Sequence, residues 1–324
     1  MNATYPVYID RTSEPFVQLI GALFAISSIL GVVSNSCIIH VLLKTKVFPR
    51  KAFFVYLIGL AVADLVYSST LPVVLAINSF IPPISWNFGL YCWLVYPVIT
   101  SHFYVSSLIV VAMNVHRLIA VYYEHYFQNI NSFRFGVQST VFIFIVGNII
   151  CWAHTFNTSS ILNQYQDDGG EMVTGYACNT NTVTKLKFLP YIRLFVNSVF
   201  GYFLPYCTIL PCSILIQYKV SKSTQKPSSK KREVADRQMT NMLIAMSLIL
   251  IATFTPRLIY LILEFLKLTS FLNYELFLFF IWIRTVNHWC NYVVYILWSP
   301  AFRRAILQKR SKVGPQRTET LQTQ

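Results

Sequence analysis

Long apolar runs alternate with short polar segments along most of this sequence. A helix needs about 20 mostly apolar residues to cross the hydrocarbon core of a bilayer, and only helices or closed β-barrels satisfy their backbone in lipid. These runs are longer and more continuous than barrel strands, which favours helices. The runs that are long enough cover residues 16–43, 52–79, 89–122, 136–156, 188–219, 239–267 and 274–297. The pattern predicts an all-α integral membrane protein, a bundle of seven transmembrane helices.

The segment after the last run predicts a short eighth helix. Ser299 and Pro300 interrupt the apolar pattern, and residues 301–307 then mix apolar with basic side chains. Such a mixture is typical of an amphipathic helix on the membrane surface. The predicted division of the chain is an N-terminal segment 1–15, a seven-helix domain 16–299, a surface helix 300–310 and a polar, disordered tail 311–324.

The composition agrees with a membrane protein, because 55% of the 324 residues are hydrophobic and only 12% are charged. Soluble domains have about 25% charged residues. The net charge of +14 does not indicate nucleic-acid binding, since the basic residues gather in short segments between apolar runs. The seven cysteines form no CxxC pair and no Cys/His spacing suited to a metal.

The basic residues predict which side each segment faces. Nineteen of the 26 Lys and Arg residues lie in segments 44–51, 117–135, 217–238 and 303–317. The side richer in Lys and Arg is the cytoplasmic one. We therefore expect a multi-pass protein of the plasma membrane with an extracellular N-terminus. Glycosylation sequons at Asn2 and Asn157 fall on the expected outer side.

Several polar residues stand inside the apolar runs, where they are costly and usually face the bundle interior. Asp64 and Asn35 lie in the middle of their spans, and Arg284, Asn287 and Asn291 share one face of the seventh helix. They either form interhelical hydrogen bonds or bind an ion. Both interpretations stay open for Asn35. For Asp64 with the two Asn residues an ion site is favoured, since carboxylate and neutral oxygens suit a hard cation.

These positions, in order and each on its own helix, resemble the signature of the rhodopsin-like G-protein-coupled receptors over nearly the whole chain. Asn35 is similar to the family's first-helix Asn, and residues 60–65 resemble the LAxAD pattern of the second helix. The further matches are residues 86–89 followed by Cys92, Trp152, Pro205, Pro256, and Asn291 with Tyr295. The resemblance implies that an extracellular ligand makes the sixth helix swing outward near Pro256, so that a heterotrimeric G protein binds.

The resemblance also implies two features of the site. A disulfide would join Cys92 to Cys178 and hold the second extracellular loop on the third helix. An allosteric sodium ion, the only cofactor expected, would bind in a pocket formed by Asp64, Ser106, Asn287 and Asn291.

One activation motif departs from the family pattern beside Arg117. The DRY motif reads His116-Arg117-Leu118, so the acid next to the Arg is lost. A neutral His cannot pair with Arg117, and a protonated His would repel it. We expect Asp236, at the base of the sixth helix, to hold Arg117 in the inactive state instead.

Two further motifs depart from the pattern. Residues 253–256 read TFTP, so Phe254 replaces the Trp of the CWxP motif before Pro256. Residues 291–295 read NYVVY, so the proline of NPxxY is missing and the seventh helix is expected to be straighter. The fifth-helix Tyr is matched by Ser213. A receptor-like protein with impaired coupling therefore stays open.

The implied ligand pocket lies between the helices on the outer side. Ile99 stands where aminergic receptors carry an acid, and Thr285 where retinal proteins carry a lysine, so neither ligand is expected. A buried guanidinium needs an anionic or hydrogen-bonding partner. For Arg257 and Arg284 that partner is either an internal acid or an acid group of the ligand. The expected ligand contacts are Ile99, Phe103, Tyr104, Arg193, Arg257, Leu261, Glu264 and Arg284.

Finer resemblances point in two directions. Residues 236–243 and 287–292 resemble the invertebrate FMRFamide-like neuropeptide receptors, which favours a short peptide. The pair His116-Arg117 and residues 69–72 are more similar to nucleotide and lipid receptors, which use arginines for phosphate or carboxylate. We expect a short neuropeptide and keep a small anionic ligand (nucleotide, lipid or carboxylic acid) as the alternative.

Two other classes of protein are weighed against a receptor. A transporter would explain the intramembrane charges, but the odd number of spans and the lack of an internal repeat argue against it. A membrane enzyme would need a metal motif or a nucleophile with its base, and neither occurs in the spans. His102, His154 and His288 stand alone in the sequence and are expected to be packed or hydrogen-bonded core residues.

Overall fold

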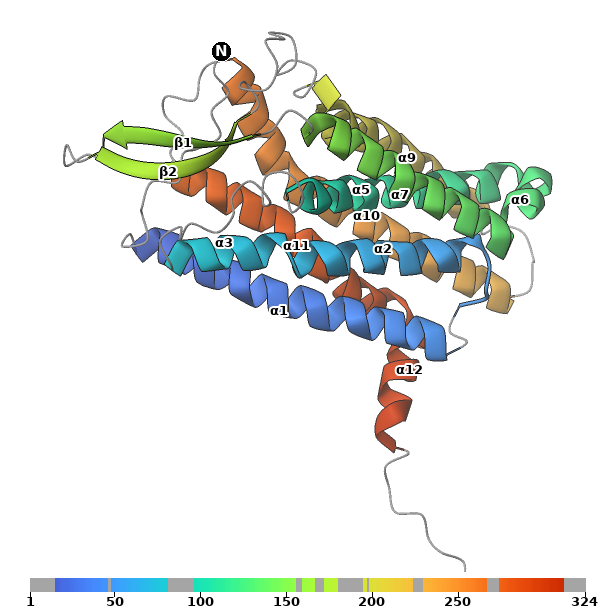
Figure 1. Ribbon diagram of the computed structural model, residues 1–324. Coiled ribbons are helices and arrows are strands. Elements are labelled where there is room, and N and C mark those ends of the chain that lie inside the picture. The colour runs from blue at the N-terminus through green and yellow to red at the C-terminus, as the bar shows by residue number, and fades with distance from the viewer. Residues whose placement is uncertain are drawn as a thin grey trace, which may run out of the picture.

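The computed structural model describes residues 15–45, 48–80, 96–155, 159–166, 172–179, 195–196, 198–223, 230–266 and 274–311. Its helices run nearly side by side (Figure 1). They are α1 Pro15–Lys44, α2 Ala52–Ser68, α3 Leu71–Phe80, α5 Tyr96–Tyr122, α6 Glu124–Ile130, α7 Phe133–Thr155, η2 Val199–Phe203, α9 Leu204–Ser223, α10 Lys230–Phe265, α11 Tyr274–Trp298 and α12 Pro300–Ser311.

Within the described residues, six helical segments are long and apolar enough to cross a membrane. They are Pro15–Lys44, Ala52–Ile77, Thr100–Tyr122, Phe133–Cys151, Val199–Lys222 and Arg237–Leu263. The seventh helix of the bundle is α11, whose 25 residues are long enough but carry Arg284, His288 and Asn291. These polar side chains lower the mean hydropathy of α11. His288 and Asn291 are buried inside the bundle, away from lipid. The predicted seven-helix bundle is confirmed.

A two-stranded hairpin was not predicted from the sequence. Strand β1, Ser159–Gln166, pairs antiparallel with β2, Met172–Asn179. The hairpin lies at the end of the bundle where α1 starts, and α6 lies at the opposite end (Figure 1). We call these two ends the hairpin end and the α6 end. The strands pair their own backbone groups outside the bundle, so no apolar run marks them.

The second span is broken into α2 and α3. Pro72 has no backbone N–H, so the carbonyl of Ser68 loses its helical donor. Ser28 of α1 replaces it, with Oγ donating to the Ser68 carbonyl at 2.8 Å. Thr70 Oγ1 donates to the carbonyl of Val66 at 2.7 Å. The kink therefore has a local cause and a specific partner on the neighbouring helix.

The fifth span begins with a π-helical turn. Because Pro205 has no N–H, the α-helical bond to the carbonyl of Gly201 is lost. In the turn, the N–H of Leu204 donates to the carbonyl of Val199, five residues earlier. This extra residue changes which side chains face inward, and Tyr202 is only 1% exposed.

Small residues let the helices approach closely. A Cβ added to Gly31 would lie 2.2 Å from Ser68 Oγ, and one added to Gly59 would lie 2.6 Å from Thr140 Cγ2. Such contacts are typical of helix packing in membranes. Large apolar side chains such as Ile29, Phe142 and Ile214 stay exposed on the outside of the bundle, as lipid-facing residues do.

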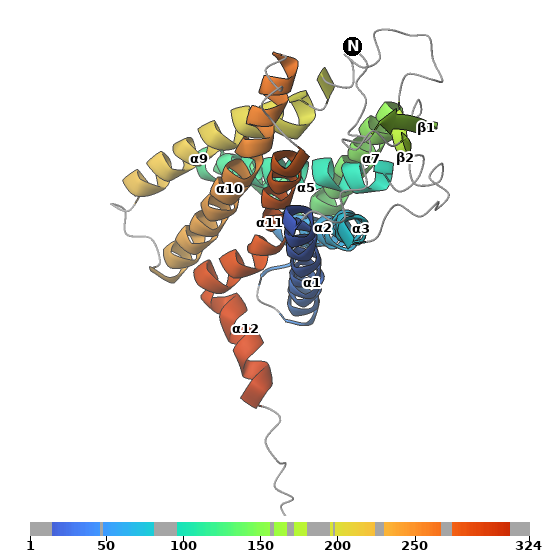
Figure 2. The same cartoon turned by 90° about the vertical axis from the view of Figure 1, so that its left-hand side faces the viewer.

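Helix α12 turns away from the bundle axis (Figure 2). Ser299 caps it, because its Oγ accepts the N–H of Phe302 at 3.3 Å, and Pro300 follows at the first helical position. Phe302 is fully buried and packs edge-on against Tyr295, with ring centroids 5.5 Å apart. Arg303 and Arg304 are exposed. The predicted amphipathic eighth helix is confirmed.

Candidate functional site

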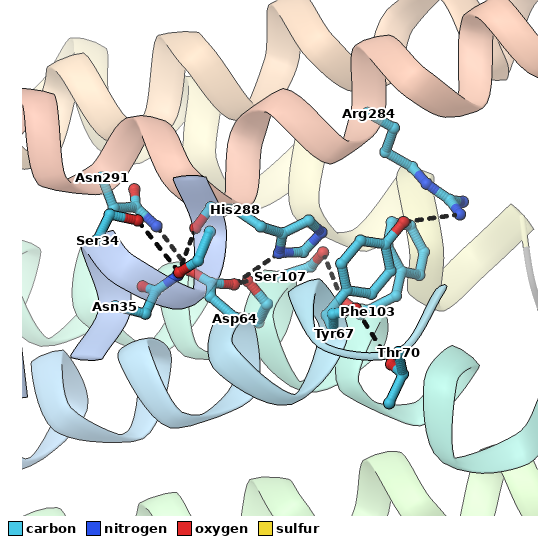
Figure 3. A network of polar contacts seen from close by, with 12 residues as sticks. Ser34, Asn35, Asp64, Tyr67, Thr70, Phe103, Ser107, Arg284, His288 and Asn291 are labelled. Carbon is cyan, nitrogen blue, oxygen red and sulfur yellow. Dashed lines mark hydrogen bonds and ion pairs between the residues drawn. The ribbon is translucent and has the colours of Figure 1, made fainter. Parts of the chain in front are cut away.

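Asp64 lies at the centre of a buried polar cluster (Figure 3). Ser106 of α5 donates to Asp64 Oδ1 at 2.7 Å, and Asn291 Nδ2 of α11 donates to Oδ2 at 2.7 Å. His288 Nδ1 lies 2.6 Å from Oδ1. When Asp64 is ionised it only accepts hydrogen bonds, and this contact then requires the hydrogen on Nδ1. Three helices thus meet at one carboxylate.

His288 is held in this position from two sides. Its ring stacks on Tyr67, with centroids 3.8 Å apart. Its backbone carbonyl accepts a hydrogen bond from Asn35 Nδ2 at 2.8 Å, and the same amide donates to the carbonyl of Gly31 at 2.9 Å. Asn35 therefore ties α1 to α11, which fits the hydrogen-bonding interpretation of this residue.

Asn287 takes no part in the cluster, although the sequence analysis placed it there. It is buried, yet among the described residues no hydrogen bond joins it to Asp64. His288 is a packed and hydrogen-bonded core residue, as expected, but it was not predicted to lie against Asp64. Its spacing of three residues from Asn291 was the available signal, because such pairs share a helix face.

Arg284 lies one turn before His288 and contacts aromatic rings (Figure 3). Its Nη2 donates to the Tyr67 hydroxyl at 3.4 Å, and its guanidinium carbon lies 4.3 Å from the ring centre of Phe103. The Tyr202 hydroxyl is a second neutral neighbour. No ion pair joins Arg284 to Asp64 in the part of the chain that the structure describes, so Asp64 is not the internal acid that could have paired with Arg284.

Phe103 contacts both Arg284 and Phe254, the residue that stands in the place of the family's Trp. Phe254 is fully buried and stacks on Phe103, with ring centroids 5.0 Å apart. Tyr202 meets Phe254 edge-on at 6.2 Å, and Tyr104 meets Phe103 at 5.3 Å. The expected residues Phe103, Tyr104 and Phe254 therefore belong to one aromatic cluster. Its member Phe254 lies two residues before Pro256.

Arg257 is packed between two aromatic rings. Its guanidinium carbon lies 4.8 Å from the ring centre of Tyr260 and 4.7 Å from that of Phe277 on α11. Leu261, one turn further along α10, is buried in the core. Cation–π contacts stabilise a guanidinium without neutralising its charge.

Arg117 fastens α5 to α10 near the α6 end. Its Nε and Nη2 donate to Thr240 Oγ1 at 3.1 and 3.0 Å, and both residues are buried. A turn away, Asn114 Nδ2 donates to Ser247 Oγ at 3.0 Å, and Ser213 Oγ donates to Asn114 Oδ1 at 3.4 Å. The sequence analysis did not identify Thr240, which lies four residues after Asp236.

His116 faces away from the Arg117–Thr240 contact. Its ring meets Tyr56 at 5.7 Å and Phe127 of α6 at 5.0 Å, both edge-on. The residue that replaces the family's acid therefore packs the short helix α6 against α2 and α5.

Several expected site residues lie outside the described part of the structure. The side chains of Cys92, Cys178, Ile99, Arg193, Asp236 and Glu264 and the sequons at Asn2 and Asn157 are among them. The Cys92–Cys178 disulfide and the Arg117–Asp236 contact therefore remain predictions.

The chain matches the profile of the family "7 transmembrane receptor (rhodopsin family)" over residues 34–295. It is 29% identical over 252 residues to the cysteinyl leukotriene receptor 1 of Mus musculus, covering 76% of this chain and 66% of that receptor. It is 22% identical over 294 residues to the somatostatin receptor type 5 of Rattus norvegicus, covering 89% and 76%. It is 23% identical over 221 residues to the C-C chemokine receptor type 1 of Macaca fascicularis, covering 66% and 58%.

A seven-helix membrane bundle with a carboxylate cluster at its centre and an arginine joining α5 to α10 defines a class of heptahelical membrane receptors. The chain belongs to the rhodopsin family of seven-transmembrane receptors. It is a multi-pass membrane protein and a receptor, not an enzyme. The matched region spans just under two thirds of the mouse leukotriene receptor.

Proposed function

We propose that this receptor recognises an extracellular ligand through an acidic group and passes the signal to a heterotrimeric G protein. In this proposal the N-terminus and the hairpin end face outward, since most Lys and Arg residues lie in the segments at the opposite end. The ligand binds among the helices at the hairpin end, and the G protein binds near Arg117.

The surroundings of Arg284 are the observation that carries the proposal. Its described polar neighbours are the neutral hydroxyls of Tyr67 and Tyr202, and its Nε is buried without a hydrogen-bond partner. A guanidinium among neutral groups is costly and suits bidentate binding of a carboxylate or phosphate. Arg257 lies against two aromatic rings, one of which is that of Phe277 on the same helix as Arg284.

The contacts of Arg284 provide a route from ligand to helix movement. A ligand acid that draws the guanidinium off the ring of Phe103 changes the face against which Phe254 stacks. Phe254 precedes Pro256 in α10, where the missing N–H weakens the helix. A ligand that binds better to the state with α10 displaced shifts the receptor toward that state.

A matched set of ligands tests this proposal. Acidic lipids, nucleotides and carboxylic acids are compared with their neutral esters or amides on cells expressing the full chain, with G-protein activation as the readout. Losing one partner of a buried charge pair costs about 2–5 kcal/mol, so Arg284→Gln should lower potency about 30-fold or more. Arg284→Lys should lose less. Equal potency of acid and ester, or of wild type and Arg284→Gln at equal surface expression, would exclude acid recognition by Arg284.

A short peptide is the second candidate. The somatostatin and chemokine receptors among the relatives favour it, whereas the leukotriene receptors favour a lipid ligand. The same cells, given amidated and free-acid peptides, distinguish the two. An amidated peptide that keeps full potency on Arg284→Gln would establish a peptide as the ligand and exclude recognition of an acidic group by Arg284.

A further inference from the structure

The polar cluster around Asp64 does not have the donor set that a sodium ion needs. A hard cation is bound by oxygen atoms that turn their lone pairs toward it. Here the contacts to Asp64 come from the hydroxyl of Ser106, the amide nitrogen of Asn291 and the imidazole of His288. Each turns a hydrogen toward the carboxylate. In the described part of the chain, no hydrogen bond joins Asp64 to Asn287, which was expected as a ligand.

The ring of His288 lies where a cation would approach the carboxylate. Its Nδ1 is 2.6 Å from Asp64 Oδ1, and both side chains are completely buried. On its other side the ring stacks on Tyr67 at 3.8 Å, so the ring cannot retreat without losing that contact. A hydrogen on Nδ1 makes this contact in both protonation states of the ring.

We propose that His288 takes the place of the sodium ion in this receptor, so that Asp64 is satisfied by the protein itself and the bundle does not respond to sodium. Oδ1 accepts from both Ser106 and His288, and Oδ2 accepts from Asn291. The carboxylate therefore joins α2, α5 and α11 without an ion between them. This inference concerns the regulation of the receptor and is independent of the ligand.

With His288 in the place of the ion, a side chain of the protein lies between Asp64 and the end of the bundle where we propose that the ligand binds. His288 contacts Tyr67, and Tyr67 accepts a hydrogen bond from Arg284. Movement of Arg284 therefore reaches Asp64 through two side-chain contacts, at any salt composition. An ion could leave this position, whereas a side chain on α11 moves only with its helix.

Thermal unfolding of the purified full-length receptor tests the proposal without a ligand. The unfolding temperature, followed by tryptophan fluorescence in detergent, is compared in NaCl, KCl and choline chloride at equal ionic strength, about 150 mM. We expect wild type to unfold at one temperature in all three salts. A higher temperature in NaCl alone, lost in Asp64→Asn, would overturn the proposal, because only a sodium ion bound at Asp64 gives both results.

A variant that makes room for an ion beside Asp64 should gain a response to sodium. His288→Ser removes the ring and leaves an oxygen that can face an ion. It should unfold about 2–4 °C higher in NaCl than in choline chloride, as expected for a ligand that binds only the folded state. Adding Asp64→Asn should abolish this difference. His288→Phe, which fills the space without a donor or an oxygen, should show no sodium response. If His288→Ser folds and stays indifferent to sodium, the ring is not what excludes the ion.

Discussion

The contact between Arg117 and Thr240 should restrain the receptor in its inactive state. Thr240 Oγ1 accepts hydrogen bonds from both Nε and Nη2 of Arg117 and so joins this arginine to α10. An outward swing of α10 has to break both hydrogen bonds. Thr240→Val keeps the shape of the side chain and removes the oxygen, so it should raise signalling in the absence of any ligand.

The size of the effect follows from the two hydrogen bonds. A hydrogen bond to a charged group contributes about 1.5–3 kcal/mol, which corresponds to a shift of about 10- to 100-fold in the equilibrium. Arg117 also has interactions beyond Thr240, so we expect the lower part of this range. If about 1% of wild-type receptors are active without ligand, Thr240→Val should bring that fraction to about 10%.

A panel of G-protein dissociation sensors in cells, normalised to surface expression, measures this basal signal. Thr240→Ser keeps the hydroxyl and should behave as wild type. Asp236→Asn, one turn earlier on α10, tests whether the predicted carboxylate contributes as well. Basal signalling of Thr240→Val equal to that of Thr240→Ser, with a coupling-competent receptor, would refute the restraint.

Two stability predictions follow from the packing. Gly31→Ala puts a Cβ within 2.5 Å of both Ser68 Oγ and Ser68 Cβ, so it should destabilise the bundle by about 1–3 kcal/mol and lower the unfolding temperature by several degrees. The double variant Gly31→Ala with Ser68→Gly should recover most of this loss, and a double variant as unstable as Gly31→Ala would contradict the clash as its cause. Phe302→Ala should lower the free energy of unfolding by about 3–5 kcal/mol because the ring is fully buried. Leu307→Ala, at a site 56% exposed, should unfold close to wild type. Equal unfolding temperatures of the two variants would show that α12 is not docked through Phe302.

The length of the apolar runs was enough to predict the bundle, because spanning lipid is a requirement that each helix meets by itself. The predicted run 16–43 and the helix Pro15–Lys44 nearly coincide. The break in the second span was not predicted, although Pro72 follows the polar residues Ser68, Ser69 and Thr70 inside the run 52–79. The hydrogen bond from Ser28 to Ser68 that accompanies the break crosses between two helices, and no pattern within one run contains it.

The site was harder to predict because it depends on how α11 is rotated about its axis. Neighbouring residues in a helix differ by about 100° in direction, and positions 287 and 288 both lie close to 284 and 291. The sequence therefore allowed either Asn287 or His288 to face Asp64. Contacts from α1 to α11 fix the choice: Asn35 binds the carbonyl of His288, and Trp282 Nε1 donates to Ser27 Oγ at 3.1 Å.

The rotation of α11 links the two proposals. His288 and Arg284 are four residues apart and point to the same side of the helix. The rotation that brings His288 to Asp64 also lays Arg284 over Phe103 and against the hydroxyl of Tyr67. Turning α11 enough to clear the carboxylate for an ion would carry the guanidinium off both aromatic partners. The sodium independence that we propose and the proposed ligand-binding role of Arg284 would therefore both follow from one orientation of α11.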